Sequence, residues 1–393
     1  MARLASIITH IRRWIIIPLS VMALLSGCEK QSDQAEPSAT ESAATSQEDP
    51  QALRLITAQV WRQGKDATQA VESSLLALQK IAQELTKDPS ELNLADARNQ
   101  WHATHQQLLQ LQPFFTLGHI NPGLFKQLEQ ARWQLDAWPI EPGYIDYFEV
   151  YKHSGIVNDI ALPITANAIR QQHGFSSDTD VAIGMHAVAY LLWGEQARRP
   201  ASDFAAQAPT NDEQQSGLEG ADLPPRRRAA LLNLLMSLML DDLRALDYKL
   251  GQSASGLNIN YASLPPQSQL QLWQQSIDSL LRQQLIGEQI APLKNVIDSS
   301  GFYQHQEFAG NQAQSIVAVL TSVESLVTQD DAAGQTLATW LNPELEVAEL
   351  RKTFTDAKQA LLEAEPNWSS LTTEQVEKLQ LQIEALAEQL NPQ

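Results

Sequence analysis

Apolar side chains recur at helical spacing along nearly all of the chain after residue 50. Leu53, Ile56 and Val60 lie three and four residues apart, and the same spacing runs from Val71 through Leu75 and beyond. Positions three and four residues apart share one face of an α-helix, so each run indicates a helix with one buried stripe. No run of alternating apolar residues bounded by turn signals stands out as a strand. The pattern predicts an all-α protein.

Turn and cap signals divide this pattern into separate helices. The polar stretch 195–224 lacks periodicity, so the helices are expected to form two antiparallel bundles, 51–204 and 224–393, joined by a connecting loop at 205–223. The predicted helices cover residues 51–87, 90–111, 121–137, 144–173 with a break at Pro163, 176–193, a long helix opening at Pro224, and then 268–297, 304–328, 343–364 and 372–390.

The first 28 residues have the order of a bacterial export signal. Arg3, Arg12 and Arg13 precede an apolar run, 14–25, that is too short to span a bilayer as a helix. Leu-Ser-Gly-Cys at 25–28 then resembles the bacterial lipobox, in which a cysteine is lipidated and becomes the new N-terminus. We therefore expect a signal peptide at 1–27 and a lipid anchor at Cys28. A plain secretory signal or a signal anchor is the alternative.

Residues 28–50 contain no large apolar side chain, which predicts a flexible tether. Glu29 follows the cysteine where an aspartate would retain a lipoprotein at the inner membrane, so we expect the periplasmic face of the outer membrane. The formal net charge of −19 disfavours nucleic acid as a partner and electrostatic docking on anionic lipid. A single cysteine excludes an internal disulfide and a cysteine-rich zinc site.

The most distinctive block of the chain is 181–203, VAIGMHAVAYLLWGEQARRPASD. His186 lies there on a segment that is apolar almost all round, and Ala189, Tyr190 and Trp193 fall on the same helical face. A histidine in such a place either hydrogen-bonds within the core, stays neutral, or binds a ligand. Spacing alone favours a core histidine. No motif of a serine hydrolase, a P-loop or a dinucleotide site occurs.

GMHAVAYLLWG resembles the GxHxxE…LLWG signature of imelysin-like proteins, iron-regulated envelope proteins that are also classed among the metallopeptidases. Flanking segments fit in order over 51–393: Ala137-Trp138-Pro139-Ile140, Arg199-Pro200 with Asp203-Phe204, Arg226-Arg227-Arg228 with Asp241-Asp242-Leu243, and Ser300-Gly301-Phe302. The resemblance implies an all-helical fold of two bundle-like domains, a site near the HxxE motif between them, and a role in iron acquisition or a neighbouring haem or metal process.

This sequence departs from the family pattern at the motif glutamate, where it has Ala189. A methyl group can neither ligate a metal nor activate a metal-bound water. The chain is therefore expected to be non-catalytic, and no residue is assigned a catalytic role. A metallopeptidase would need a carboxylate from elsewhere in the chain.

Other candidates come from the helix 90–111 and from the arginine run. His102 and His105 are three residues apart, a spacing that can present two imidazoles to a metal or simply form a polar face. If the family geometry holds, His105 approaches His186. Arg226–Arg228 at a helix start oppose the helix dipole, so we expect acidic partners for them, or an anionic ligand.

The expected protein is a lipid-anchored, periplasm-facing accessory of iron or haem acquisition that binds a metal species or an uptake partner near His186. A metallopeptidase, or a structural or interaction lipoprotein with a vestigial site, is the alternative. The expected metal ligands are His186 and His105, and the expected ligand-binding residues are His186, Gly184, Tyr190, Trp193 and Asp203.

Overall fold

The computed structural model describes residues 49–148, 150–298 and 308–392. Helices dominate these ranges, and the β pairing within them is a single bridge between Phe148 and Tyr151. The predicted all-α class is confirmed. The signal peptide, Cys28 and most of the tether, together with Ser300-Gly301-Phe302, lie outside the described residues.

The long helices begin at caps that can be read in the sequence. Asp49 accepts a hydrogen bond from the Gln51 backbone N–H at 2.8 Å, and Ser90 caps the next helix through Asn93 at 3.2 Å. The α-helices are α1 (Pro50–Lys87), α2 (Glu91–Leu108), α3 (Gln112–Ile120), α4 (Pro122–Asp136), α5 (Pro142–Ile145), α6 (Gly155–Asn158), α7 (Ala166–Gln172), α8 (Met185–Trp193), α9 (Asn211–Gln215), α10 (Pro224–Gly251), α11 (Gly256–Ala262), α12 (Pro266–Asp278), α13 (Gln312–Thr328), α14 (Leu337–Leu341), α15 (Val347–Ala364) and α16 (Thr373–Leu390).

The predicted helix 144–173 is wrong, and the predicted helix 176–193 begins only at Met185. The stretch 144–173 holds only the short helices α5, α6 and α7 with irregular chain between them, and 174–184 is not helical. The cause is a long-range partner: Arg227 of α10 donates hydrogen bonds to the carbonyl oxygens of Ile156, Val157, Asp159 and Leu162 at 2.6–2.9 Å. Carbonyl groups held by a buried guanidinium do not need a helical ladder.

The expected single helix 268–297 is also divided. After α12 the chain continues as η6 (Ser279–Ile290), a π-helix, and then as η7 (Ala291–Asp298), a 3-10 helix. A π-helix of 12 residues is unusual, since π geometry is mostly seen as single-turn bulges at functional sites. The expected helices 304–328 and 343–364 begin later, at Gln312 and Val347.

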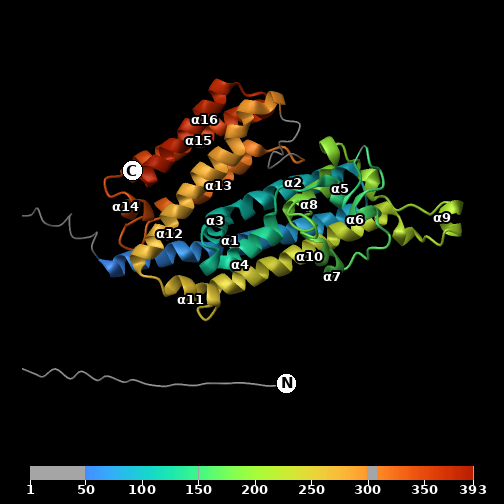
Figure 1. Cartoon of the computed structure of the whole chain (residues 1–393), viewed down its shortest axis with the longest axis horizontal. Helices are drawn as coiled ribbons and strands as arrows, with labels where there is room; N and C mark the ends of the chain where they lie inside the picture. The colour runs from blue at the N-terminus through green and yellow to red at the C-terminus, as the bar shows by residue number, and fades with distance from the viewer. Residues whose placement is uncertain (1–48, 149, 299–307, 393) are drawn as a thin grey trace, which may run out of the picture. The chain divides into compact units, whose positions relative to one another are not determined.

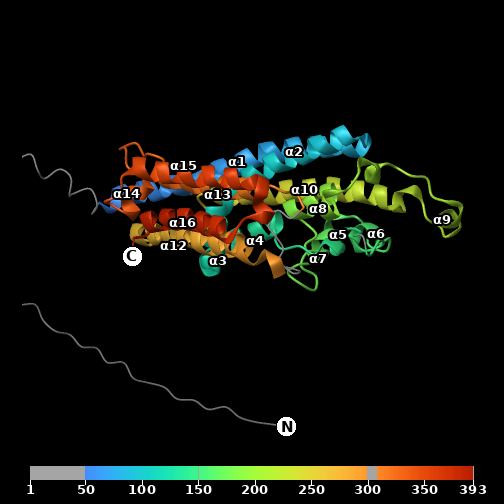
Figure 2. The ribbon, with the colours of Figure 1, turned by 90° about the horizontal axis from the view of Figure 1, so that it is seen from above.

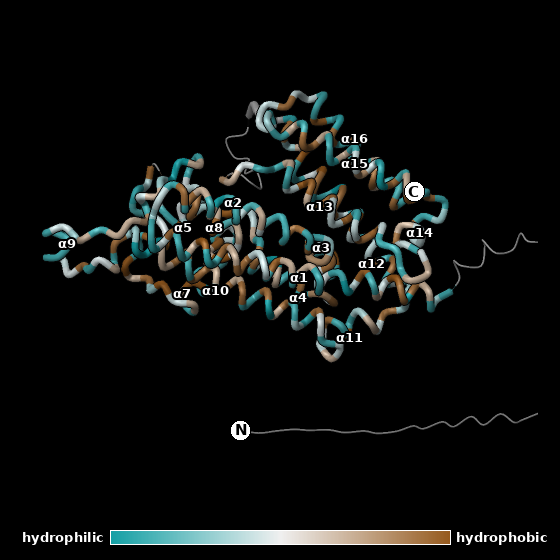
Figure 3. Tube along the Cα trace, turned by 180° about the vertical axis from the view of Figure 1, so that it is seen from behind, coloured by the Kyte–Doolittle hydropathy of each residue, from teal (hydrophilic) through white to brown (hydrophobic). Residues whose placement is uncertain are grey.

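Helix α1 packs along α2, α10 and α12, and α10 also contacts α4 (Figure 1). Farther along the chain, α15 lies beside α13, and α16 lies beside α12 and η6 (Figure 2). Hydrophobic and hydrophilic residues alternate along these helices, as stripes buried on one side require (Figure 3). α10 follows the expected bundle boundary yet packs on helices that precede it. The division into bundles at 51–204 and 224–393 stays a prediction.

Helix α8 lies at the centre of this packing, because all nine of its residues are buried. It contacts α2, α4, α5 and α10. Gly184 caps its start with φ +106°, and an added Cβ would meet the Leu135 carbonyl oxygen at 3.1 Å. Only glycine combines that backbone conformation with such a close approach. Because the backbones of Gly184 and Leu135 approach so closely, the start of α8 lies against the end of α4.

Candidate functional site

Two histidines and an aspartate from three helices meet beside α8. His105 Nε2 lies 2.9 Å and His186 Nε2 lies 3.3 Å from the same atom, Asp136 Oδ1. The exposed fractions of the three side chains are only 1–2%. One ligand atom from each residue lies within 4.8 Å of the others. Among the described residues, these three form the group of histidine and acidic side chains that could hold a metal ion.

Local packing fixes each member of this His–Asp–His cluster. The His105 ring stacks on Trp101 at 4.8 Å, and Trp101 Nε1 donates to the Met185 carbonyl oxygen at 2.8 Å, which ties α2 to the start of α8. Gln112 Nε2 donates to Asp136 Oδ2 at 2.9 Å. Trp138 packs against the His186 ring with the centroids 4.8 Å apart. Side chains held in this way are preorganised for a ligand.

The electrostatics favour an ionised carboxylate at Asp136 and a neutral imidazole at His186. Burial on its own would raise the pKa of Asp136, but the two imidazoles outweigh it and hold that pKa well below its usual range. Burial lowers the pKa of His186, although Asp136 opposes this. An ionised carboxylate and neutral imidazole are the protonation states of metal ligands.

The donor set fits a divalent transition metal. Two imidazole nitrogens and one carboxylate oxygen are the set used by non-haem iron(II) sites and by many zinc sites. Gln112 on the far carboxylate oxygen is the kind of supporting contact that orients a ligating carboxylate. A bound metal would replace the hydrogen bond between His105 Nε2 and Asp136 Oδ1 and would compete with protons for these ligands, so its affinity should fall at low pH.

Haem does not fit this place. The cavity that reaches Asp136 has a volume of about 240 Å³. Pockets for drug-sized ligands begin at about 300 Å³, and a macrocycle needs more than that. His186 is 2% exposed and has no open side on which a flat ligand could stack.

Asp136 is the member that the sequence reasoning missed. Ala189, at the motif glutamate position, is buried and offers no ligand. The carboxylate beside His186 comes instead from the last residue of α4, directly before Ala137-Trp138-Pro139-Ile140. That segment resembles the family, so the acidic residue directly before it was the signal from which Asp136 could have been found.

The structure places the other expected ligand-binding residues outside the His–Asp–His cluster. Trp193 packs on Trp101 with the ring centroids 5.3 Å apart, so one ring separates it from His105. Tyr190 OH donates to the Tyr147 carbonyl oxygen at 2.8 Å. Asp203 accepts from Arg199 at 2.8 Å. Tyr190 and Asp203 therefore belong to a second cluster.

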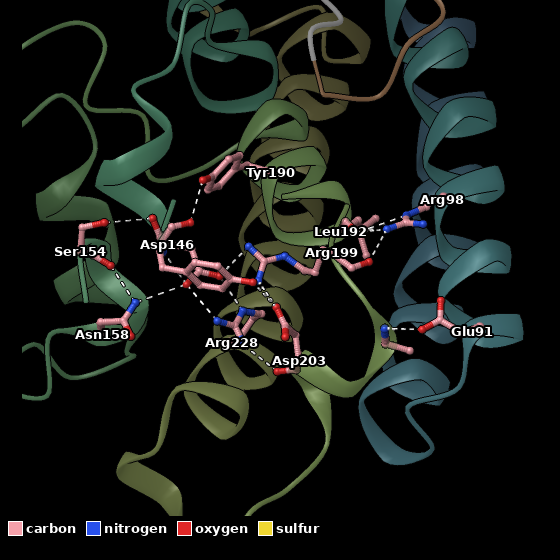
Figure 4. Close-up of polar contacts among 12 residues, drawn as sticks. Glu91, Arg98, Asp146, Ser154, Asn158, Tyr190, Leu192, Arg199, Asp203 and Arg228 are labelled. Atoms are coloured by element: carbon pink, nitrogen blue, oxygen red, sulfur yellow. Dashed lines mark hydrogen bonds and ion pairs between the residues drawn. The ribbon is translucent and has the colours of Figure 1, made fainter. Parts of the chain in front are cut away.

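This second cluster is a buried ionic network around Asp146 (Figure 4). Asp146 Oδ2 lies 2.9 Å from Arg199 Nη2 and 2.5 Å from Arg228 Nε, and Arg228 Nη2 donates to Oδ1 at 3.0 Å. The Tyr147 ring lies against both guanidinium groups, 5.0 Å from Arg199 and 5.5 Å from Arg228. With Asp203, two acids balance two arginines, so the network is suited to hold the fold together.

The arginine run 226–228 therefore has an acidic partner, as expected, and that partner is Asp146. Asp242, which follows the arginine run on the same helix, binds Arg170 of α7 through two hydrogen bonds of 3.0 Å. Arg227 uses carbonyl oxygens and Arg228 uses Asp146. These contacts fasten α10 to the irregular region 144–173 that precedes α8.

His173 gives this region a predictable response to pH. Its Nε2 donates to the Trp133 carbonyl oxygen at 2.9 Å, and Ala182 N–H donates to its Nδ1 at 3.2 Å, so the neutral ring uses both nitrogens. Burial lowers its pKa from 6.5 to about 4, against the hydrogen bond to Trp133. The unfolded chain therefore takes up a proton first as the pH falls. This part of the stability is complete above about pH 6.5 and is lost towards pH 4.

We expect His173→Gln to show a smaller loss of stability than wild type between about pH 7 and about pH 4.5. Urea unfolding midpoints of both proteins at the two pH values measure it. An equal loss in both proteins would contradict the assignment.

Comparisons with known proteins agree with this architecture. A profile of the Imelysin family matches residues 65–393. A protein from Parabacteroides distasonis that is described as an iron-regulated protein A precursor aligns with a TM-score of 0.59 and 13% identity. The alignment covers 88% of this chain and 95% of that one. An imelysin-like protein from Psychrobacter arcticum aligns with a TM-score of 0.58 and 15% identity, over the same shares of each chain.

No curated protein matches the sequence. Within the described ranges, no helix has the length and apolar character needed to cross a membrane. The two solved structures share the fold, and the family profile covers most of the chain with the His186 block inside it. The chain belongs to the imelysin family.

Proposed function

We propose that this imelysin-family chain binds a divalent metal ion, ferrous iron first, at His105, Asp136 and His186, as a non-catalytic accessory of iron acquisition. The observation that carries the proposal is the buried two-histidine, one-carboxylate donor set. Such ligands suit iron(II) and zinc, and the metal would supply a Lewis-acid or redox centre held away from solvent. The iron-regulated relative named above gives iron its priority.

Binding is favoured over hydrolysis by the state of the carboxylate. Both oxygens of Asp136 already have partners, Oδ1 at the two imidazoles and Oδ2 at Gln112. Ala189 cannot act as a base. The described site therefore has ligands for a metal, and neither Asp136 nor position 189 offers a spare carboxylate to activate water.

The proposal includes the location that the N-terminal sequence predicts. A lipid anchor at Cys28 would hold the chain at the outer membrane, facing the periplasm, where an uptake system could receive the ion from it. Labelling with a radioactive fatty acid, lost in Cys28→Ala, tests the anchor.

We expect calorimetric titration of the purified protein with Fe²⁺ under anaerobic conditions, and with Co²⁺, to show one saturable site. Asp136→Asn should weaken binding on the order of 100-fold, the upper range for ligand support in metal sites. Asp242→Asn, which removes a half-buried acid outside the cluster, is the matched control and should bind as wild type does. Absence of saturable binding in wild type, or equal binding in Asp136→Asn, would refute the proposed site.

A further inference from the structure

A cavity leads from the surface to the His–Asp–His cluster. The buried side chains of Asp136 and Gln112 line it together with the exposed side chains of His119 and Glu288. Its walls come from the consecutive helices α3 and α4 and from η6 and α13, which lie farther along the chain. Asp136, itself 3% exposed, thus has an opening towards solvent through this cavity.

The polar groups of the cavity are mostly oxygen donors for a cation. The side-chain amide nitrogen of Gln112 donates a hydrogen bond to Asp136, and that of Gln284 donates one to Thr116 Oγ1 at 3.0 Å. Both amide nitrogens are thus occupied, and each side chain also carries a carbonyl oxygen that can bind a cation. Carboxylates and amide oxygens are the groups that replace water around divalent cations.

The charge of the cavity also favours a cation. Arg132 lines it but is engaged by Glu129, with Nη2–Oε1 at 2.7 Å and Nε at 3.2 Å from both oxygens. The neutralised arginine leaves Asp136 and Glu288 as the carboxylates that set the potential. With the charge of Arg132 offset by Glu129, the net charge of the cavity is negative, and a cavity of net negative charge concentrates cations at its mouth.

The unusual π-helix η6 builds this wall. Leu280, Gln284, Leu285, Glu288 and Gln289 of η6 all line the cavity. Single-turn π segments inside helices are frequently found at functional sites. Here it presents Gln284 and Glu288 along the route to Asp136.

We propose that this cavity is the entry path for a free, hydrated divalent cation, with Glu288 attracting the ion and Gln112 and Gln284 replacing part of its water shell. The inference rests on the proposed function, because the path leads to the proposed metal site. It also defines the substrate class: a free divalent cation enters, whereas an anionic chelate is excluded by size and by charge.

The test is stopped-flow mixing of the full-length protein with Co²⁺, whose absorption changes when imidazole and carboxylate bind. Glu288→Gln should slow association about 10-fold at low salt, and rising salt should shrink the difference. Glu388→Gln, the same charge change at an exposed position of α16 that does not line the cavity, should leave the rate unchanged. Citrate added in excess should slow binding in proportion to the free Co²⁺ that remains.

A second variant, Gln284→Trp, places bulk in the path without touching the ligands. It should slow association and dissociation together and leave the equilibrium affinity near that of wild type. Equal rates in Glu288→Gln and Glu388→Gln, or citrate-bound Co²⁺ entering as fast as the free ion, would overturn the path while leaving the metal site standing. Absence of Co²⁺ binding in wild type would overturn both.

Discussion

Replacing Asp146 with alanine is expected to lower the free energy of unfolding by about 3–5 kcal/mol, the cost of removing one partner from a buried ion pair. The Asp146 side chain is fully buried, and the side chains of Arg199 and Arg228 are 1% and 3% exposed. Without the carboxylate, two buried guanidinium groups lose the partner that they share, while Arg199 keeps Asp203. The loss should exceed that of a simple cavity of the same size.

Asp146→Asn separates charge from shape. The amide keeps the volume of the side chain and a carbonyl oxygen for the Tyr147 backbone N–H, which donates to Asp146 at 2.8 Å. Its loss of stability should approach that of Asp146→Ala if the charge dominates. Urea unfolding at neutral pH, with the midpoint and slope fitted together, gives both values.

The matched control is Asp356→Ala. Asp356 pairs with Lys352 on the surface of α15, where the two side chains are 52% and 74% exposed. Surface changes of this kind stay within about 0.5 kcal/mol. A loss in Asp146→Ala no larger than in Asp356→Ala would mean that the network around Asp146 does not stabilise the fold.

The helices that could be predicted from the sequence are those whose stability is local. Asp49, Ser90 and Thr372 cap α1, α2 and α16 through contacts two or three residues away, and apolar stripes follow each cap. Such contacts can be predicted from residues that are close together in the sequence. The helix ends at Lys87 and Leu390 fall where the periodicity predicts them.

The region before α8 could not be predicted because its partners lie far along the chain. Arg227 holds the carbonyl oxygens of residues 156–162 from 65–71 positions away. Apolar side chains in that stretch mimic a helical stripe, and no local signal reveals the guanidinium that replaces the helical ladder. The same limit hid Asp136, which reaches His105 across 31 positions.

For the site itself, the sequence identified the two histidines, and the resemblance to the imelysin family predicted that they come together. The His105 and His186 rings do come together, with centroids 5.2 Å apart. Spacing on α2 could not tell His105 from His102, because both positions are compatible with a polar face. Burial separates them: His105 is 1% exposed and faces Asp136. Their roles as metal ligands stay a prediction.

This difference between neighbouring histidines gives the second large prediction. His105→Ala should weaken Co²⁺ binding on the order of 100-fold or more, because it removes one of three ligands from the cluster. His102→Ala should leave the affinity within a few-fold of wild type. His102 takes part elsewhere: Asn311 Nδ2 donates to its Nδ1 at 2.9 Å, and burial lowers its pKa to about 4.

Rescue distinguishes ligation from packing. The His105 ring stacks on Trp101, so its removal opens a space of imidazole shape beside Asp136. Free imidazole at millimolar concentration should refill that space and restore the Co²⁺ absorption bands in His105→Ala. Loss of binding through misfolding would not be rescued in this way, and near-ultraviolet circular dichroism of the variant checks its packing directly. Equal weakening in His102→Ala and His105→Ala, with no effect of imidazole, would show that His105 supports the fold of α2 and does not ligate the ion.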